Sequence, residues 1–130
     1  YYFFDVGVAS QLQGRTLKAE TPEFGAGFEA YVMHELAAYA DDRAAEDTRY
    51  WRSTSGFEVD FVLGDHTAIQ VKATRTVTNE HLKGLKVLAE EQHFKRYLCV
   101  AMVDRPRTVD GITVLPWRPF LDALWADKYR

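Results

Sequence analysis

Two short runs of β-forming residues, Phe57 to Leu63 and Thr67 to Ala73, restrict the fold of this chain more than any other feature. The loop-forming residues Gly64-Asp65-His66 separate them, which is typical of a β-hairpin. With a loop of these three residues, one surface of the hairpin is almost wholly apolar. Burial of each large apolar side chain is worth about 1.5 to 3 kcal/mol, so apolar burial determines the register. The facing residues are Val59 with Val71, Phe61 with Ile69, and Leu63 with Thr67.

The opposite surface of the hairpin carries polar side chains in the same register. Asp60 lies directly across from Gln70, and Lys72 follows on the same side because side chains alternate along a strand. A slip of one residue would turn the apolar set to the wrong side. The apolar neighbours therefore place Asp60, Gln70 and Lys72 next to one another. The same surface also carries Glu58, Val62 and Ala68.

The rest of the chain predicts further helices and strands around this hairpin. A helix is indicated over 25–41, where apolar side chains recur at spacings of three and four: Phe28, Val32, Leu36 and Tyr39. Thr48 to Ser53 supplies an earlier strand, so the hairpin belongs to a meander. The remaining pattern predicts a helix over 78–93 capped by Thr78, strands over 96–103 and 112–115, and a helix over 119–125. The predicted order is α-β-β-β-α-β-β-α, which is an α/β fold.

Length and composition indicate one compact domain. With 130 residues, 47% of them hydrophobic, and a formal charge of −3, the chain is too short for two domains and too apolar to be disordered. It has no run of the roughly 20 apolar residues that cross a membrane. Residues 1–24 are expected to be a lead-in segment after a missing N-terminal region, and residues 25–130 the domain itself. The single cysteine, Cys99, is expected in the core of a cytoplasmic protein.

Val59-Asp60-Phe61 followed by Gln70-Val71-Lys72 resembles the active-site signature of the PD-(D/E)XK nuclease superfamily. In that superfamily an acid on a helix precedes both strands. The stretch Gly25-Ala26-Gly27-Phe28-Glu29 resembles the first-helix motif of its Holliday-junction-resolvase and Mrr-like branches, which makes Glu29 the candidate and Glu35 the second choice. The resemblance implies a restriction-endonuclease-like core, in which helices flank a mixed central sheet.

A second resemblance covers most of the chain. Several fragments, taken together and in order, are similar to the domain of unknown function that ends a large group of prokaryotic AAA-type ATPases. This resemblance implies that an ATPase module precedes Tyr1 and is a partner of the domain, and it implies no established activity. The fragments are Tyr2 to Gly7, Phe28-Glu29, His34-Glu35-Leu36, Tyr50-Trp51-Arg52, Gly56 to Phe61, Lys83 to Lys86 and Leu115-Pro116-Trp117.

The nuclease resemblance implies a metal-dependent reaction on DNA. Asp60 and Glu29 would offer anionic oxygens, and the Gln70 carbonyl a neutral one, to Mg²⁺ or Mn²⁺, which prefer oxygen ligands. The ion would polarise a phosphodiester and lower the pKa of a bound water, while Lys72 orients that water or balances charge. The superfamily usually has an acid where this chain has Gln70, so a lower metal affinity is expected.

A rival hypothesis gives this fold no catalytic activity. Gln70 and the negative net charge favour a silent module that docks onto its own ATPase or a partner protein. Considered alone, Asp60 could equally be an acid on the solvated surface. Lys72 could equally be a lysine whose aliphatic stem covers the edge of the sheet. Glu29 equally fits a first-turn acid that the helix dipole stabilises. Metal binding and DNA cleavage distinguish the two hypotheses.

Three further residues are expected to support the candidate site: Glu35, Arg52 and Glu58. Glu35 falls on the buried face of its helix, so its carboxylate needs a partner, which Arg52 or Lys72 could provide. Arg52 also belongs to a basic group, interleaved with aromatic residues, that fits a nucleic-acid backbone as well as a solvated face. Position 38 is alanine, so His34-Glu35 lacks the second histidine of a zinc-protease helix, and the chain has no glycine-rich phosphate loop.

Overall fold

A long helix opens the part of the chain that the computed structural model describes, residues 22–43 and 48–129. Helix α2 (Pro22–Asp42) includes the predicted helix over 25–41. Its predicted apolar stripe is buried, so the prediction of a core-facing helix is confirmed. Residues 1–21 of the predicted lead-in segment 1–24 lie outside the described residues, and residues 22–24 belong to α2.

The predicted meander is confirmed as three antiparallel strands, β1 (Thr48–Arg52), β2 (Glu58–Leu63) and β3 (Thr67–Lys72). Phe61 pairs with Ile69, as the three-residue loop predicts. The pairing of Leu63 with Thr67 is confirmed as well. Residues near the loop therefore follow the register that apolar burial selects.

The C-terminal half completes a six-stranded mixed sheet. Strand β4 (Arg96–Ala101) lies parallel to β3, and β6 (Ile112–Pro116) lies parallel to β4. Helix α4 (Trp117–Trp125) follows β6 directly. The short strand β5 (Arg107–Val109) pairs antiparallel with β6, so the order across the sheet is β1-β2-β3-β4-β6-β5.

The strand β5 makes the predicted order α-β-β-β-α-β-β-α wrong, because three strands rather than two stand between α3 and α4. Residues Arg107 and Thr108 are exposed, so no apolar alternation reveals this strand. Its signal lies in the turn that follows. Asp110 and Gly111 have φ angles of 50° and 82°, and an Asp-Gly pair of this kind closes two-residue hairpins.

The helix predicted over 78–93 is shorter at both ends. It begins as a 3₁₀ turn, η1 (Glu80–Leu82), and continues as α3 (Lys83–Glu91). Thr78 does not cap it through its side chain as predicted. Instead the Thr78 backbone N–H donates a hydrogen bond to His81 Nδ1 at 3.0 Å. The imidazole therefore satisfies a backbone group at the start of this turn.

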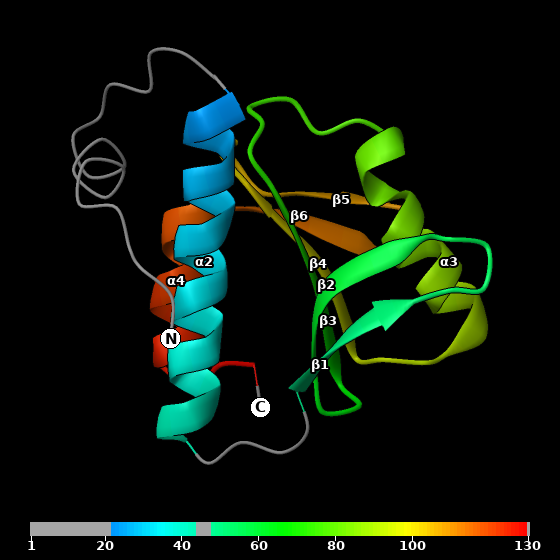
Figure 1. The fold of residues 1–130 in the computed structure, drawn as a ribbon, viewed down its shortest axis with the longest axis horizontal. Coiled ribbons are helices and arrows are strands. Elements are labelled where there is room, and N and C mark those ends of the chain that lie inside the picture. Colours follow the sequence, from blue (N-terminus) through cyan, green and yellow to red (C-terminus); the bar gives the residue numbers. More distant parts are fainter. Residues whose placement is uncertain (1–21, 44–47, 130) are drawn as a thin grey trace.

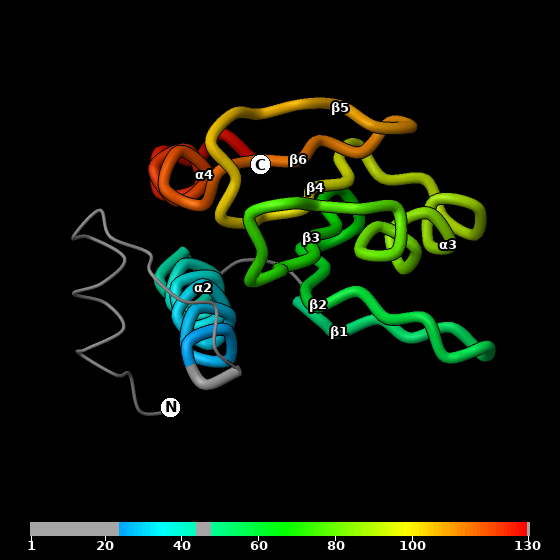
Figure 2. The backbone as a smooth tube through the Cα atoms, turned by 90° about the horizontal axis from the view of Figure 1, so that it is seen from above, coloured from blue at the N-terminus to red at the C-terminus, as the bar shows by residue number. Residues whose placement is uncertain are grey.

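Helices cover both faces of the sheet, which gives three layers (Figure 1). Viewed from above, α2 and α4 lie on one face and α3 on the other (Figure 2). One apolar core, which includes Phe28, Phe61 and Ile69, fills the space under α2 and α4. A second core, which includes Val62 and Leu85, lies under α3. The predicted arrangement of a mixed sheet flanked by helices is confirmed.

Cys99 lies fully buried in the core under α3, as predicted. Loss of hydration raises the pKa of its thiol to about 12, so the thiolate that would act as a nucleophile is not formed at neutral pH. Among the helices of the described residues, none combines the length and the apolar character needed to cross a bilayer.

Helix α3 approaches the sheet very closely at Gly84. A Cβ atom at this position would lie 2.0 Å from the backbone carbonyl oxygen of Glu58, at the start of β2. Glycine costs a helix interior roughly 1 kcal/mol relative to alanine, so its presence needs a packing reason. The close contact with β2 supplies that reason.

Gly84→Ala is expected to lower the free energy of unfolding by about 1 to 3 kcal/mol, because the backbone clash outweighs the gain in helix propensity. Urea denaturation of the variant and the wild type measures the difference. Glu90→Ala, at an exposed position of the same helix, is the control and should change stability by less than about 0.5 kcal/mol. A Gly84→Ala protein as stable as the wild type would contradict the close packing of α3 on β2.

Candidate functional site

The ladder between β2 and β3 is regular only near its loop, where Phe61 pairs with Ile69. Beyond this pair, Asp60 Oδ2 accepts a hydrogen bond from the Val71 backbone N–H at 2.8 Å. The Asp60 backbone N–H in turn donates to Gln70 Oε1 at 3.3 Å. Side-chain oxygens therefore take the places of backbone carbonyls, because buried N–H groups need an acceptor. The two strands separate at the point where the predicted polar residues lie.

A register shift in the neighbouring ladder of β1 and β2 accompanies this separation. From Arg49 to Trp51 there are two steps along β1, whereas their partners on β2 are three steps apart. The extra residue turns the strand over, as in a β-bulge. Val59 therefore joins the core under α3, while Phe61 joins the core under α2 and α4. The predicted single apolar surface, with Val59 opposite Val71, is wrong for this reason.

An open pocket of about 480 Å³ lies at the separated ends of the two strands. Asp60, Gln70 and Lys72 all line it, so the structure brings these predicted residues together. Gln70 is only 6% exposed, whereas Asp60 and Lys72 are half-buried. The loop before β2, the start of β2, η1 and the start of α3 supply the other lining residues: Gly56, Phe57, Glu58, Glu80, His81, Lys83 and Gly84.

Glu29 approaches the same region from α2 without lining the pocket. Its Oε2 accepts a hydrogen bond from the Ala73 backbone N–H at 3.1 Å, directly after the end of β3. Its carboxylate also interacts electrostatically with Lys72 and with Asp60. The predicted helical acid, Glu29, therefore interacts with two of the predicted strand residues, Asp60 and Lys72.

Burial raises the pKa of both carboxyl groups. For Asp60, loss of hydration is the main cause, and Glu58 adds to it, while the Val71 N–H and Lys72 oppose it. For Glu29, loss of hydration again dominates, with a backbone N–H and Lys72 opposing it. The ionised form of each group is therefore destabilised by its surroundings. Partly desolvated carboxylates of this kind are common at functional sites.

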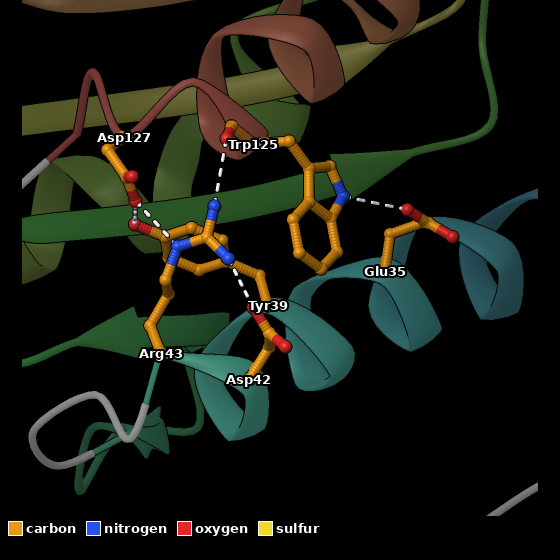
Figure 3. Close-up of polar contacts among 6 residues, drawn as sticks. All are labelled: Glu35, Tyr39, Asp42, Arg43, Trp125 and Asp127. Carbon is orange, nitrogen blue, oxygen red and sulfur yellow. Dashed lines mark hydrogen bonds and ion pairs between the residues drawn. The ribbon is translucent and has the colours of Figure 1, made fainter.

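Glu35, the second candidate for the helical acid, lies elsewhere. Its Oε1 accepts a hydrogen bond from Trp125 Nε1 at 2.9 Å, across the contact of α2 with α4 (Figure 3). The prediction that Arg52 or Lys72 is the partner of Glu35 is wrong, because the indole of α4 takes that role. The Arg52 side chain is 63% exposed, and its Nε lies 4.0 Å from Glu58 Oε2. An exposed ion pair at this distance contributes little to the stability of the fold.

Three lining residues, Glu80, His81 and Lys83, were not predicted as part of a site. Lys83 forms an ion pair with Glu80 at 2.9 Å. Since His81 Nδ1 accepts the Thr78 N–H, the neutral imidazole carries its proton on Nε2. Of this segment, only Lys83 to Lys86 contributed to the family resemblance in the sequence. No local pattern there indicates that η1 faces β2 and β3.

Most of the side chains around this pocket that could bind a metal ion would do so through oxygen atoms. Within residues 22–43 and 48–129, no group of three His, Cys, Asp or Glu side chains is placed to hold a metal ion. Asp60 and Gln70 line the pocket, and the Glu29 carboxylate on α2 interacts electrostatically with Asp60. At the positions that resemble the nuclease signature, Gln70 stands where an acid is usual. Glu58 and Glu80 add two further carboxylates to the pocket lining.

Asp60→Asn is expected to keep an acceptor for the Val71 N–H and to remove the charge that burial destabilises. An acid with a raised pKa contributes stability that is fully present below its ordinary pKa and is lost as the pH rises through the raised pKa. In metal-free buffer at pH 7 the variant should therefore unfold at higher urea than the wild type. Below pH 3.8, the ordinary pKa of aspartate, the two proteins should converge.

Urea denaturation from pH 3 to pH 8 measures this difference. Asp65→Asn, which removes an exposed carboxylate from the β2–β3 loop, is the matched control and should behave like the wild type at every pH. An Asp60→Asn variant that is less stable than the wild type at pH 7 would show that the ionised Asp60 is not destabilised by burial.

The family of this chain follows from comparison with known proteins. No curated protein and no solved structure matches it. Residues 24–120 match the family described as Domain of unknown function (DUF4143), which is known to lie C-terminal to AAA-type ATPases. The match runs from α2 to the first turn of α4 and includes the whole sheet. Because it covers most of the chain, this chain belongs to the DUF4143 family.

Proposed function

We propose that the pocket at the separated ends of β2 and β3 is the divalent-cation site of a nuclease-like domain, which binds DNA and hydrolyses its phosphodiester bonds. One observation carries the proposal: Asp60, Gln70 and Lys72, which together resemble a nuclease signature, line one open pocket. The order of elements around it supports a PD-(D/E)XK core, because α2 precedes the hairpin and α3 leads to a parallel strand. The domain would act beside the ATPase module of its own polypeptide.

The donor set suits Mg²⁺ or Mn²⁺. Asp60 and Glu29 each use one carboxylate oxygen to accept a backbone N–H, and their other oxygens make no hydrogen bond within the described part of the chain. Mg²⁺ is commonly held by one or two carboxylates together with water and substrate phosphate. Asp60 and Glu29 would hold the ion, with the Gln70 carbonyl as a neutral ligand. A bound cation supplies Lewis acidity at the phosphoryl group and a water of lowered pKa.

Lys72 is the cationic group of the proposed site. It lines the pocket together with Asp60, and its charge lowers the pKa of both Asp60 and Glu29. It forms no ion pair within the residues that the structure describes, so it is available to a ligand in the pocket. We expect the ammonium to orient the attacking water or to stabilise the negative charge that develops on the phosphoryl oxygens.

One observation favours a second candidate function, a silent module that docks onto its own ATPase or a partner protein. Gln70 Oε1 accepts the Asp60 N–H, and Asp60 Oδ2 accepts the Val71 N–H. The two side chains thus also hold the separated strands together. A chain that kept Asp60 and Gln70 for this structural purpose would need no metal.

Calorimetry with Mn²⁺ is expected to show binding to the wild-type protein. Asp60→Asn should weaken this binding by at least about tenfold, since it removes one of two anionic ligands and keeps the acceptor for Val71. Gln70→Glu should tighten it, because the variant has a third carboxylate. Asp65→Asn is the control and should bind like the wild type. No binding heat at millimolar Mn²⁺ in any of the proteins would contradict the metal site and favour docking.

Incubation with branched and linear DNA and Mg²⁺ tests the reaction itself. The wild type is expected to cleave at least one of the substrates, and EDTA to stop cleavage. Lys72→Gln should lower the rate about 10²- to 10³-fold, the usual effect of losing one group that stabilises transition-state charge. Lys128→Gln, at an exposed position after α4, is the control. Equal cleavage by Lys72→Gln and the wild type would reject the proposed role of Lys72.

A further inference from the structure

A second open pocket, of about 640 Å³, lies between α2 and α4. These helices cover the sheet face opposite α3 (Figure 2). The first pocket is lined instead by η1, the start of α3 and the ends of β2 and β3. The two pockets share no residue. The walls of the second pocket are mainly aromatic and charged, and consist of Tyr31, Glu35, Trp117, Arg118, Leu121, Asp122 and Trp125.

Glu35 is the acid at the aromatic wall of this pocket. One of its oxygens accepts the Trp125 indole N–H at 2.9 Å, and the other makes no hydrogen bond within the described residues. Tyr31 lies one turn earlier on α2 and lines the same pocket. Burial, and then the charge of Glu35, raise the pKa of its phenol. Tyr31 also meets the Trp117 ring edge to face at 6.0 Å. An open carboxylate oxygen therefore lies beside a cluster of rings.

The Trp125 side of the pocket is held in place by the contact between the helix ends (Figure 3). Arg43, which follows α2, donates from Nη2 to the Trp125 carbonyl oxygen at 3.0 Å and from Nε to Asp127 Oδ1 at 2.9 Å. Tyr39 donates its hydroxyl to the same Asp127 oxygen at 2.8 Å. A wall fixed in this way needs little ordering when a ligand binds, which favours affinity.

The charges of the pocket favour a cation. Its lining has two carboxylates, Glu35 and Asp122, and one guanidinium, Arg118. The Arg118 guanidinium already lies 5.1 Å from the centre of the Trp117 ring, a distance typical of a cation–π contact. Arg118 is exposed, so a second cation can displace it at small cost. The pocket therefore combines an aromatic face that accepts a guanidinium with an acid that has one oxygen open.

We infer that this pocket binds an arginine side chain carried by a protein partner. The planar guanidinium stacks on Trp117 in place of Arg118 and donates a hydrogen bond to the open oxygen of Glu35, while Asp122 adds negative charge at the rim. The same negative charge repels a polyanion such as DNA. This docking site is independent of the chemistry proposed at Asp60 and stands whether or not the other pocket binds a metal.

The test follows the indole N–H signals of the full ¹⁵N-labelled chain by NMR during titration with the peptide acetyl-Gly-Arg-Gly-amide. Trp117 and Trp125 are expected to shift in a saturable way, while Trp51, buried in the core under α3, stays unchanged. The matched peptide with citrulline in place of arginine has the same shape without the charge and should cause no saturable shift. Equal responses to both peptides would overturn the inference.

Two variants test the roles of the charged residues. Glu35→Gln keeps an acceptor for the Trp125 indole and is expected to bind the arginine peptide about tenfold more weakly, because it loses a charged hydrogen-bond partner. Arg118→Gln removes the competing guanidinium and should bind more tightly than the wild type. Unchanged Trp51 signals and thermal midpoints in the free variants show that the fold is kept. Unchanged affinity in Glu35→Gln, or weaker binding in Arg118→Gln, would contradict the proposed site.

Discussion

The hydrogen bond from the Val71 backbone N–H to the Asp60 carboxylate is the contact on which the architecture of the candidate site depends. A buried backbone N–H must have an acceptor, and here a side chain supplies it where the ladder would have offered a carbonyl. The strands can therefore separate without leaving this group unsatisfied. The separated ends form the walls of a pocket, and the carboxylate that permits the separation lines it. The cost is a charged group partly removed from water, visible in the raised pKa of Asp60.

The three-layer arrangement explains why the polar side chains of the site gather at the separated strand ends. Both faces of the central strands are covered, so polar side chains reach solvent only where the strands end or separate. Gly84 lets α3 lie directly against the start of β2, and this close approach brings His81 and Lys83 to the pocket. The helix that closes one core is thus also a wall of the site.

The two pockets differ in the ligands that they suit. The pocket at β2 and β3 combines acids with Lys72 and Lys83, which fits a cation together with a phosphate. The pocket between α2 and α4 combines aromatic rings with acids, which fits an organic cation. The two pockets are lined by different helices and share no residue.

The sequence alone determined those features that depend on contacts between neighbours in the chain. Periodicity located α2 and the meander, and a hairpin joined by a three-residue loop places Asp60 near Gln70 and Lys72 because the two strands are adjacent. Helices and strands need only local spacing to be recognised, and a hairpin register needs only its turn and its apolar face.

Tertiary structure alone decided the features that depend on distant segments. The face that Val59 occupies follows from a shift against β1, and the partner of Glu35 lies on a helix 90 residues further along the chain. The short strand β5 exists because β6 offers it an edge. No local pattern records these contacts, because each depends on which surfaces meet when the layers pack. The sequence therefore indicated which residues could form a site, and packing decided which of them came together and what closed around them.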